Sequence, residues 1–197
     1  AVNTMIVQPT GRLVGRNTDV FGFLAALDAR SSGWRGRLRT AVVLGAGGAA
    51  RAIIVALQDA GAREIRVVNR TRKRAETLAQ EFGAPVTVGA WDGRTSALSD
   101  ATLVVNTTTL GMVGNPALDL RLDALPRTAV VTDIVYAPLQ TPLLAAAAAR
   151  GNPTVDGLEM LLHQARPGFE AWFGRAPEVT EDLRRHVLAD LNAVSGA

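Results

Sequence analysis

Two short segments of this chain combine residue types suited to binding an anionic ligand. An apolar run at residues 41–44 stops at a glycine cluster, and an alanine-rich helical pattern follows at once. Glycines in such a turn let the backbone approach a pyrophosphate, and free N–H groups at the helix start bind it. The spacing Gly45-x-Gly47-x-x-Ala50 fits a dinucleotide-binding turn with alanine at the third glycine position. We therefore expect pyrophosphate contacts from Gly45, Ala46, Gly47, Gly48 and Ala49.

The end of the next apolar run indicates which dinucleotide binds. Asn69 lies 24 residues after Gly45, and four of the five residues that follow it are basic. A chain that selects NAD usually has Asp or Glu here, which binds the ribose 2′-hydroxyl. Basic side chains suit a 2′-phosphate instead, so we predict NADP(H) as the cofactor. Each motif alone also fits a simpler role, a turn in another strand–helix unit or a solvated helix start. The residues expected at the 2′-phosphate end are Asn69, Arg70, Thr71 and Arg74.

Composition narrows the function classes. The 197 residues include no cysteine and two histidines, which excludes disulfides and thiolate or histidine-cluster metal sites, so we predict no metal. No membrane-length apolar run and no signal peptide are visible, so we expect a cytoplasmic protein. The net charge of +3 comes with twenty Arg and one Lys, a balance that suits a small anionic substrate. Aromatic residues make up only 5%, which argues against nucleic acid as a partner.

The elements that position these segments alternate along the chain. Apolar patterns predict strands at 1–7, 12–14, 41–44, 65–69, 86–88, 102–106, 129–134 and 154–155. They predict helices at 19–30, 48–60, 72–82, 142–150, 158–173 and 181–194. The uninterrupted apolar runs at 102–106 and 129–134 are typical of strands buried in a parallel sheet. The pattern predicts an α/β fold with a doubly wound, Rossmann-type parallel sheet.

The two ends of the chain suggest a second domain. The sequence begins with Ala rather than Met, within a predicted strand pair, and its last helices exceed what one nucleotide domain needs. We expect residues 1–18 to be a remnant of a substrate-binding domain and residues 19–157 to form the NADP-binding domain. Residues 158–197 are then helices that return to the substrate domain.

Seven motifs follow one another in an order that resembles a known family. They are Ala1-Val2-Asn3-Thr4, Gly15-Arg16-Asn17-Thr18-Asp19, Gly45-Ala46-Gly47-Gly48-Ala49, Asn69-Arg70-Thr71, Asn106-Thr107-Thr108-Thr109-Leu110-Gly111-Met112, Asp133-Ile134-Val135-Tyr136 and Asp156-Gly157-Leu158-Glu159-Met160-Leu161-Leu162-His163-Gln164. The chain resembles the C-terminal two-thirds of the shikimate dehydrogenase family, without that family's N-terminal substrate-binding segment. The resemblance implies an NADP-dependent oxidoreductase of aromatic amino-acid biosynthesis that reversibly reduces 3-dehydroshikimate to shikimate.

The resemblance also implies roles for individual residues. Asp19 matches the aspartate of a Lys–Asp pair that handles the proton during hydride transfer. From the residues alone, this position strongly favours a helix N-cap role for Asp19, and both roles can hold at once. We expect His163 to be a surface or capping residue without a catalytic role. The matching substrate-contacting positions are Asn3, Asp19, Tyr136 and Gln164, and those lining the nicotinamide are Ile134 and Gly157.

Departures from the family pattern leave alternatives open. The family's catalytic lysine precedes the first motif, and the one lysine here, Lys73, lies in the basic cluster, so we expect the chain as given to be catalytically incomplete. Val20 and Glu159 stand where the family often has glycine, and we expect Glu159 near the site or in solvent. A quinate or aminoshikimate dehydrogenase, a non-catalytic NADP(H)-binding module and, more weakly, a methylene-tetrahydrofolate dehydrogenase remain alternatives. A homodimer is the assembly we expect, with the oligomeric state left open.

Overall fold

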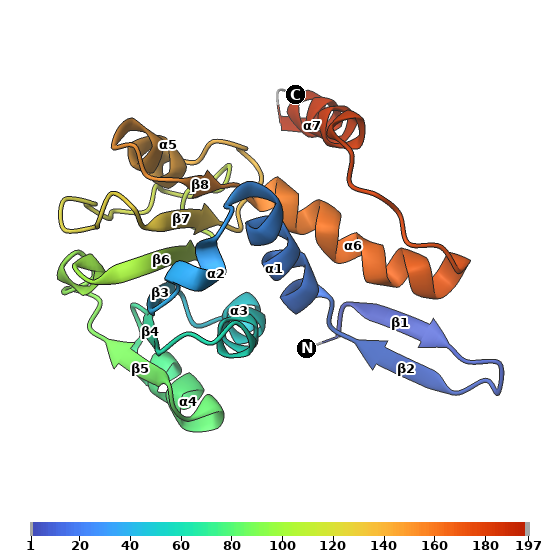
Figure 1. Ribbon diagram of the computed structural model, residues 1–197, viewed down its shortest axis with the longest axis horizontal. Helices are drawn as coiled ribbons and strands as arrows, with labels where there is room; N and C mark the ends of the chain where they lie inside the picture. Colours follow the sequence, from blue (N-terminus) through green and yellow to red (C-terminus); the bar gives the residue numbers. More distant parts are fainter. Residues whose placement is uncertain (1, 196–197) are drawn as a thin grey trace.

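The computed structural model describes residues 2–195 and is built around a six-stranded parallel sheet (Figure 1). The strand order is β5-β4-β3-β6-β7-β8. All pairs in this sheet are parallel. The strands are β3 (Thr40–Leu44), β4 (Glu64–Val68), β5 (Val86–Gly89), β6 (Ala101–Asn106), β7 (Val130–Asp133) and β8 (Thr154–Val155).

The centre of the sheet is buried on both faces. Every residue of β3 is buried, and its side chains alternate between two apolar cores. Ala41 and Val43 pack on one face, and Val42 and Leu44 pack on the other. The chain winds outward from β3 toward β5 and then outward from β6 toward β8. This reversal between β3 and β6 leaves a crevice beyond the carboxyl ends of those strands, where open α/β sheets bind ligands.

Helices cover the two faces unequally. One core contains side chains of α1 (Asp19–Arg30), α2 (Trp34–Arg37), α3 (Gly48–Asp59), α4 (Arg72–Phe82) and the start of α6 (Gly157–Phe173). The other core contains side chains of η1 (Ser96–Leu98), the segment 118–125 and α5 (Pro142–Ala149).

A two-stranded hairpin lies apart from the main sheet (Figure 1). β1 (Thr4–Val7) pairs antiparallel with β2 (Leu13–Arg16), and α6 extends from the edge of the main sheet to this hairpin. The Trp172 indole N–H near the end of α6 donates to the Met5 carbonyl at 2.9 Å. The last helix, α7 (Glu181–Ser195), folds back beside the start of α6.

The predicted fold class and the order of the predicted elements are confirmed. Helix α2 does not follow from the sequence pattern, because its four residues include a glycine and are too few for helical periodicity. The first strand begins at Thr4 rather than at residue 1, and residue 1 lies outside the described part of the chain. Among the described residues, none of the helices has the length and apolarity to cross a membrane. The predicted domain boundaries stay a prediction.

Candidate active site

The carboxyl ends of β4, β3 and β6 border a cleft of about 340 Å³. It combines the glycine turn, the basic segment after β4 and the loop after β6. The lining residues are Gly45, Ala46, Gly47, Asn69, Arg70, Arg74, Trp91, Thr107, Thr108, Thr109 and Leu110. Of the cofactor residues expected from the sequence, Gly48, Ala49, Thr71, Ile134 and Gly157 are not among them.

The glycine turn has the geometry that a close backbone approach requires. Gly45 has φ +109°, and a Cβ there would lie 2.5 Å from Thr107 Oγ1, so a larger residue would be both strained and obstructed. Thr107 is fixed in turn, because its hydroxyl donates to the Leu44 carbonyl at 2.8 Å. Gly47 is the N-cap of α3, and no side chain caps this helix start. A Cβ on Gly47 or Gly48 would meet open space, so the first N–H groups of α3 are available to an anion.

The basic end of the cleft contains two arginines without acidic partners. Arg70 and Arg74 line the cleft, and neither forms an ion pair with a carboxylate within residues 2–195. Arg72, on the same helix, is bound to Glu76 at 2.7 Å. Thr71 is the N-cap of α4, and its carbonyl accepts a hydrogen bond from the Asn69 side chain at 2.9 Å. Within the described part of the chain, the cleft therefore presents two guanidinium groups without a carboxylate partner at its β4 end.

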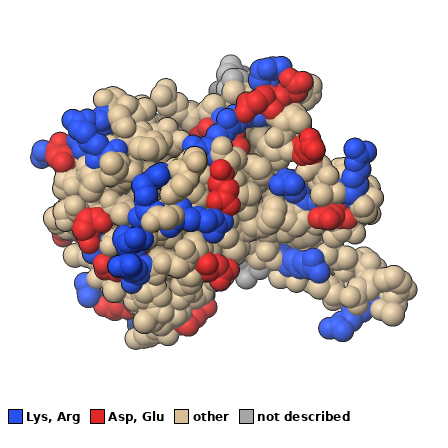
Figure 2. All heavy atoms as spheres, in the orientation of Figure 1, with Lys and Arg blue, Asp and Glu red and all other residues tan. Residues whose placement is uncertain are grey.

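Several other arginines of the chain bind acidic side chains instead. Figure 2 shows basic and acidic side chains interspersed over the face it displays. Arg35 binds Asp28, Arg66 binds Glu64 and Asp100, and Arg94 binds Asp119. Arg70 and Arg74 differ from these paired arginines in lining the cleft without an acidic partner among residues 2–195, which leaves their charge for a ligand.

A buried polar network supports the loop after β6. Asn106 donates to the Asp133 carboxylate at 3.0 Å and to the Leu110 carbonyl at 3.1 Å, and its own carbonyl accepts from Thr108. Asp133 also accepts from the Thr141 hydroxyl at 2.7 Å. Burial raises the pKa of Asp133, and the donated hydrogen bonds oppose that rise. This network and the position of Trp91 were not predicted from the sequence. For the network, the polar residues that end two buried apolar strands were a usable signal.

The predicted substrate residues near the start of α1 lie in contact. The side-chain amide of Asn3 donates to the Asp19 carboxylate at 2.8 Å. The side-chain oxygen of Asn3 accepts from the Thr18 backbone N–H at 3.0 Å. The interpretation of Asp19 as the N-cap is wrong, because Thr18 is the N-cap and Asp19 is the first helical residue. The Asp19 backbone N–H instead donates to the Asn17 side chain at 2.9 Å. The Asp19 carboxylate is therefore oriented by Asn3 and makes no cap to its own helix.

The remaining predicted residues lie on α6 and after the end of β7. Gln164 lies on α6 where that helix crosses α1, since a Cβ on Gly22 would lie 2.6 Å from the Gln164 Cβ. Tyr136 is 37% exposed after β7. The Ile134 backbone N–H donates to the backbone carbonyl of Asn106 at 3.2 Å. A Cβ on Gly157 would lie 2.5 Å from the Ile134 carbonyl oxygen, so α6 begins directly against the end of β7.

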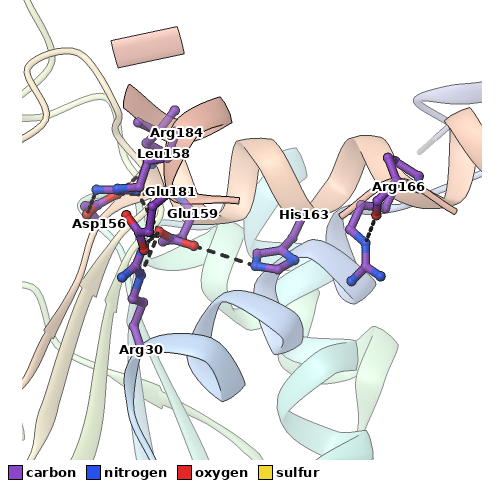
Figure 3. Close-up of polar contacts among 9 residues, drawn as sticks. Arg30, Asp156, Leu158, Glu159, His163, Arg166, Glu181 and Arg184 are labelled. Atoms are coloured by element: carbon purple, nitrogen blue, oxygen red, sulfur yellow. Dashed lines mark hydrogen bonds and ion pairs between the residues drawn. The ribbon is translucent and has the colours of Figure 1, made fainter. Parts of the chain in front are cut away.

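Two side chains of α6 are buried where solvent exposure was expected. Glu159 is only 1% exposed, so it does not point into solvent, and Arg30 and Arg184 hold its carboxylate two residues from Gly157 (Figure 3). His163 is buried rather than on the surface, with its Nε2 3.6 Å from Glu159. Both side chains project from α6 into its contacts with α1 and α7, which residue type alone did not reveal.

Comparisons with known proteins agree with this geometry. The family model described as Shikimate / quinate 5-dehydrogenase matches residues 30–112, and the Shikimate 5'-dehydrogenase C-terminal domain matches residues 157–187. A shikimate dehydrogenase (NADP(+)) of Paramagnetospirillum magneticum is 58% identical over 189 residues, which are 96% of this chain and 68% of that protein. This chain belongs to the shikimate dehydrogenase family. The predicted family is therefore confirmed, and the chain spans about two-thirds of its relative's length.

Solved members of the family share the fold. Quinate dehydrogenase from Corynebacterium glutamicum, in complex with NAD, is 33% identical with a TM-score of 0.87 over 96% of this chain and 68% of that one. The shikimate 5-dehydrogenase of Thermus thermophilus, in complex with NADP(H) and shikimate, is 37% identical with a TM-score of 0.78 over 97% of this chain and 68% of that one. The family thus includes proteins solved with either nicotinamide cofactor.

Proposed function

We propose that this chain carries the cofactor site and part of the substrate site of an NADP-dependent shikimate dehydrogenase, which interconverts 3-dehydroshikimate and shikimate. Membership of the family supports the reaction class. The observation that carries the cofactor choice is the cleft itself. It joins an uncapped helix start to two unpaired arginines, and none of its lining residues is acidic. An NAD site would instead place a carboxylate at the end of β4.

The cofactor fits across the edge of the sheet. Arg70 and Arg74 bind the 2′-phosphate, and the start of α3 binds the pyrophosphate. Because β6 and β7 lie on the other side of β3 from β4, the nicotinamide then extends past the loop after β6 to Ile134 and Gly157. When bound, NADP(H) supplies or accepts the hydride, and the protein's task is to place the substrate carbonyl against it.

The substrate lies beside Asp19 in this proposal. Asn3 holds one carboxylate oxygen of Asp19 at 2.8 Å, and the second oxygen is 3.5 Å from the Asn17 amide. A carboxylate has more acceptor sites than these contacts use, so Asp19 can also orient a proton donor at the substrate oxygen. Gln164 and Tyr136 supply further polar contacts to the substrate hydroxyls. We also propose a cytoplasmic homodimer, for which light scattering of the purified protein is the measurement.

Cofactor titration tests the central claim. Charge-assisted hydrogen bonds contribute roughly 1.5–3 kcal/mol each, so NADP+ should bind at least about tenfold more tightly than NAD+. Arg70→Ala should weaken NADP+ binding and leave NAD+ binding unchanged. Arg72→Ala is the matched control, because Arg72 is exposed on the same helix but already paired with Glu76. Equal affinities for the two cofactors would contradict the proposal.

A substrate comparison tests the reaction. Shikimate and quinate are offered with NADP+, and formation of the reduced cofactor is followed. Preference for shikimate supports the proposed substrate, whereas faster oxidation of quinate replaces it with the family's other named activity. The 197-residue chain alone should turn over slowly, since its only lysine lies at the cofactor end.

A further inference from the structure

The start of α6 is fixed by a single carboxylate. Asp156 is the N-cap of α6, and its Oδ1 accepts from the backbone N–H groups of Leu158 at 3.1 Å and Glu159 at 3.3 Å. The next residue, Gly157, lies against the carbonyl oxygens of Ile134 and Val135. Whatever holds Asp156 therefore also sets how Gly157 meets the end of β7.

Asp156 is held from outside its own helix. Arg184 of α7 donates to Asp156 Oδ1 at 3.1 Å and Oδ2 at 2.7 Å, which is a two-point contact of the guanidinium with the carboxylate. The same guanidinium donates to Glu159 at 2.8 Å (Figure 3). Arg184 thus grips two acidic side chains in the first turn of α6. A planar guanidinium that binds two carboxylates fixes orientation as well as distance.

An arginine at the end of α1 also binds Glu159. Arg30, the last residue of that helix, donates to Glu159 at 2.7 Å and to Glu181 of α7 at 2.7 Å. The hydrogen bond that Arg30 donates to the Glu159 carboxylate raises the pKa of Arg30. Because Glu159 is 1% exposed, removing one arginine would leave a buried charge poorly compensated. The ends of three helices therefore meet at one buried carboxylate.

We propose that Arg184 is a positioning residue for the nicotinamide end of the cofactor site, acting through Asp156 and Glu159. The inference rests on the proposed function, in which Gly157 and Ile134 line the nicotinamide. Arg70, Arg74 and the glycine turn bind the other end of the cofactor and lie on different elements. Loss of Arg184 should thus affect one half of the cofactor and spare the other.

Binding of two ligands separates these halves. NADP+ is compared with adenosine 2′,5′-bisphosphate, which carries the adenosine and the 2′-phosphate but no nicotinamide. Arg184→Met should weaken NADP+ binding about tenfold and leave binding of the bisphosphate unchanged. Arg184→Lys keeps the charge but loses the two-point contact, so it should recover part of the NADP+ affinity. Arg185→Met is the matched control, because Arg185 is exposed and pairs with Asp182 within α7.

The binding of the two ligands by these variants supports or overturns the positioning role of Arg184. A selective loss of NADP+ affinity in Arg184→Met, partly restored by lysine, supports the positioning role. Equal weakening of both ligands, in either variant, overturns it and makes α7 a general stabilising element. Unchanged binding of both ligands overturns it as well. If the unsubstituted chain binds neither ligand, the proposed cofactor site itself is wrong, which is a separate failure. Arg184→Lys keeps the test available if the methionine variant does not fold.

Discussion

Asp19 shows how much one residue's position changes its interpretation. Its residue type suits a helix cap, yet the cap is Thr18 and the Asp19 carboxylate is turned toward Asn3. Without the capping role, the carboxylate serves its own helix only as a negative charge in the first turn. This strengthens the case for the proposed role in proton transfer.

Asp19→Asn should separate the two roles by kinetics. The substitution keeps the size of the side chain and removes its charge, so kcat should fall by roughly 10²–10⁴-fold with little change in KM. The measurement needs a longer protein in which the family's lysine-bearing segment precedes this chain. Asp28→Asn is a control, because Asp28 lies near the other end of α1, where it pairs with Arg35. A kcat near that of the unsubstituted enzyme would rule out the catalytic role.

His163 should make stability depend on pH. Burial lowers its pKa, nearby Glu159 opposes the shift, and Arg166 and Arg30 add to it. The folded protein then binds a proton less readily than the unfolded chain. This stability is full above the unfolded pKa of about 6.5 and is lost as pH falls through the folded pKa.

The prediction for His163 is a difference between variants. When the pH is lowered from about 7.5 to about 5.5, the free energy of unfolding should fall less in His163→Gln than in the unsubstituted protein. His186→Gln is the control, since His186 is exposed on α7. Denaturant unfolding at the two pH values measures the effect. Identical pH dependence in all three proteins would mean that His163 titrates normally.

At the scale of elements, the crossing of α1 and α6 depends on a glycine, Gly22. Gly22 is buried at the crossing, and a Cβ there would lie 2.6 Å from the Gln164 Cβ and 2.9 Å from its backbone. The two helices can approach this closely only because position 22 is glycine. The crossing sets the distance between Asp19, one turn earlier on α1, and Gln164.

Gly22→Ala should therefore destabilise the protein by about 1–3 kcal/mol, because an overpacked contact forces the helices apart. Gly36→Ala is a matched control in α2, where an added Cβ meets nothing within 4 Å. There the substitution should be neutral or stabilising by up to about 1 kcal/mol. Thermal and denaturant unfolding measure both. Similar effects at the two positions would contradict the close crossing.

The N-cap of α5 also serves the cofactor cleft. The Thr141 hydroxyl accepts from the Leu144 backbone and donates to Asp133, which in turn holds Asn106. Thr141→Val removes both contacts and should lower stability by about 1–3 kcal/mol and loosen the loop at 107–110. Thr141→Ser keeps the hydroxyl and should behave nearly as the unsubstituted protein. Equal stabilities of the valine and serine variants would mean that the hydroxyl does not matter.

Sequence patterns predicted the elements better than the contacts between them. Strands such as β6 and β7 follow from apolar runs, and the glycine turn and the basic segment were correctly expected to share one cleft. The burial of Glu159 was not predictable, because its partners Arg30 and Arg184 lie 129 and 25 residues away. Its proximity to His163 could have been found, since four residues in a helix bring side chains to the same face.

For the molecule as a whole, cofactor binding should appear as added stability. A ligand at about 100 times its Kd adds about 2.7 kcal/mol to the unfolding free energy. For a chain of this size that corresponds to a rise in Tm of roughly 5–10 °C. NADP+ should therefore raise Tm more than NAD+ at the same concentration, and Arg70→Ala should remove most of the difference. The same rise with both cofactors would contradict selection by the 2′-phosphate.

The chain's preference for arginine has a practical consequence at this scale. Lys73 is its only lysine, and it is exposed in the first turn of α4, beside the arginine-lined end of the cleft. An amine-reactive dye therefore finds one side-chain target, next to the proposed 2′-phosphate site. A dye attached to Lys73 would therefore lie beside that site, and its emission would report on cofactor occupancy without any substitution.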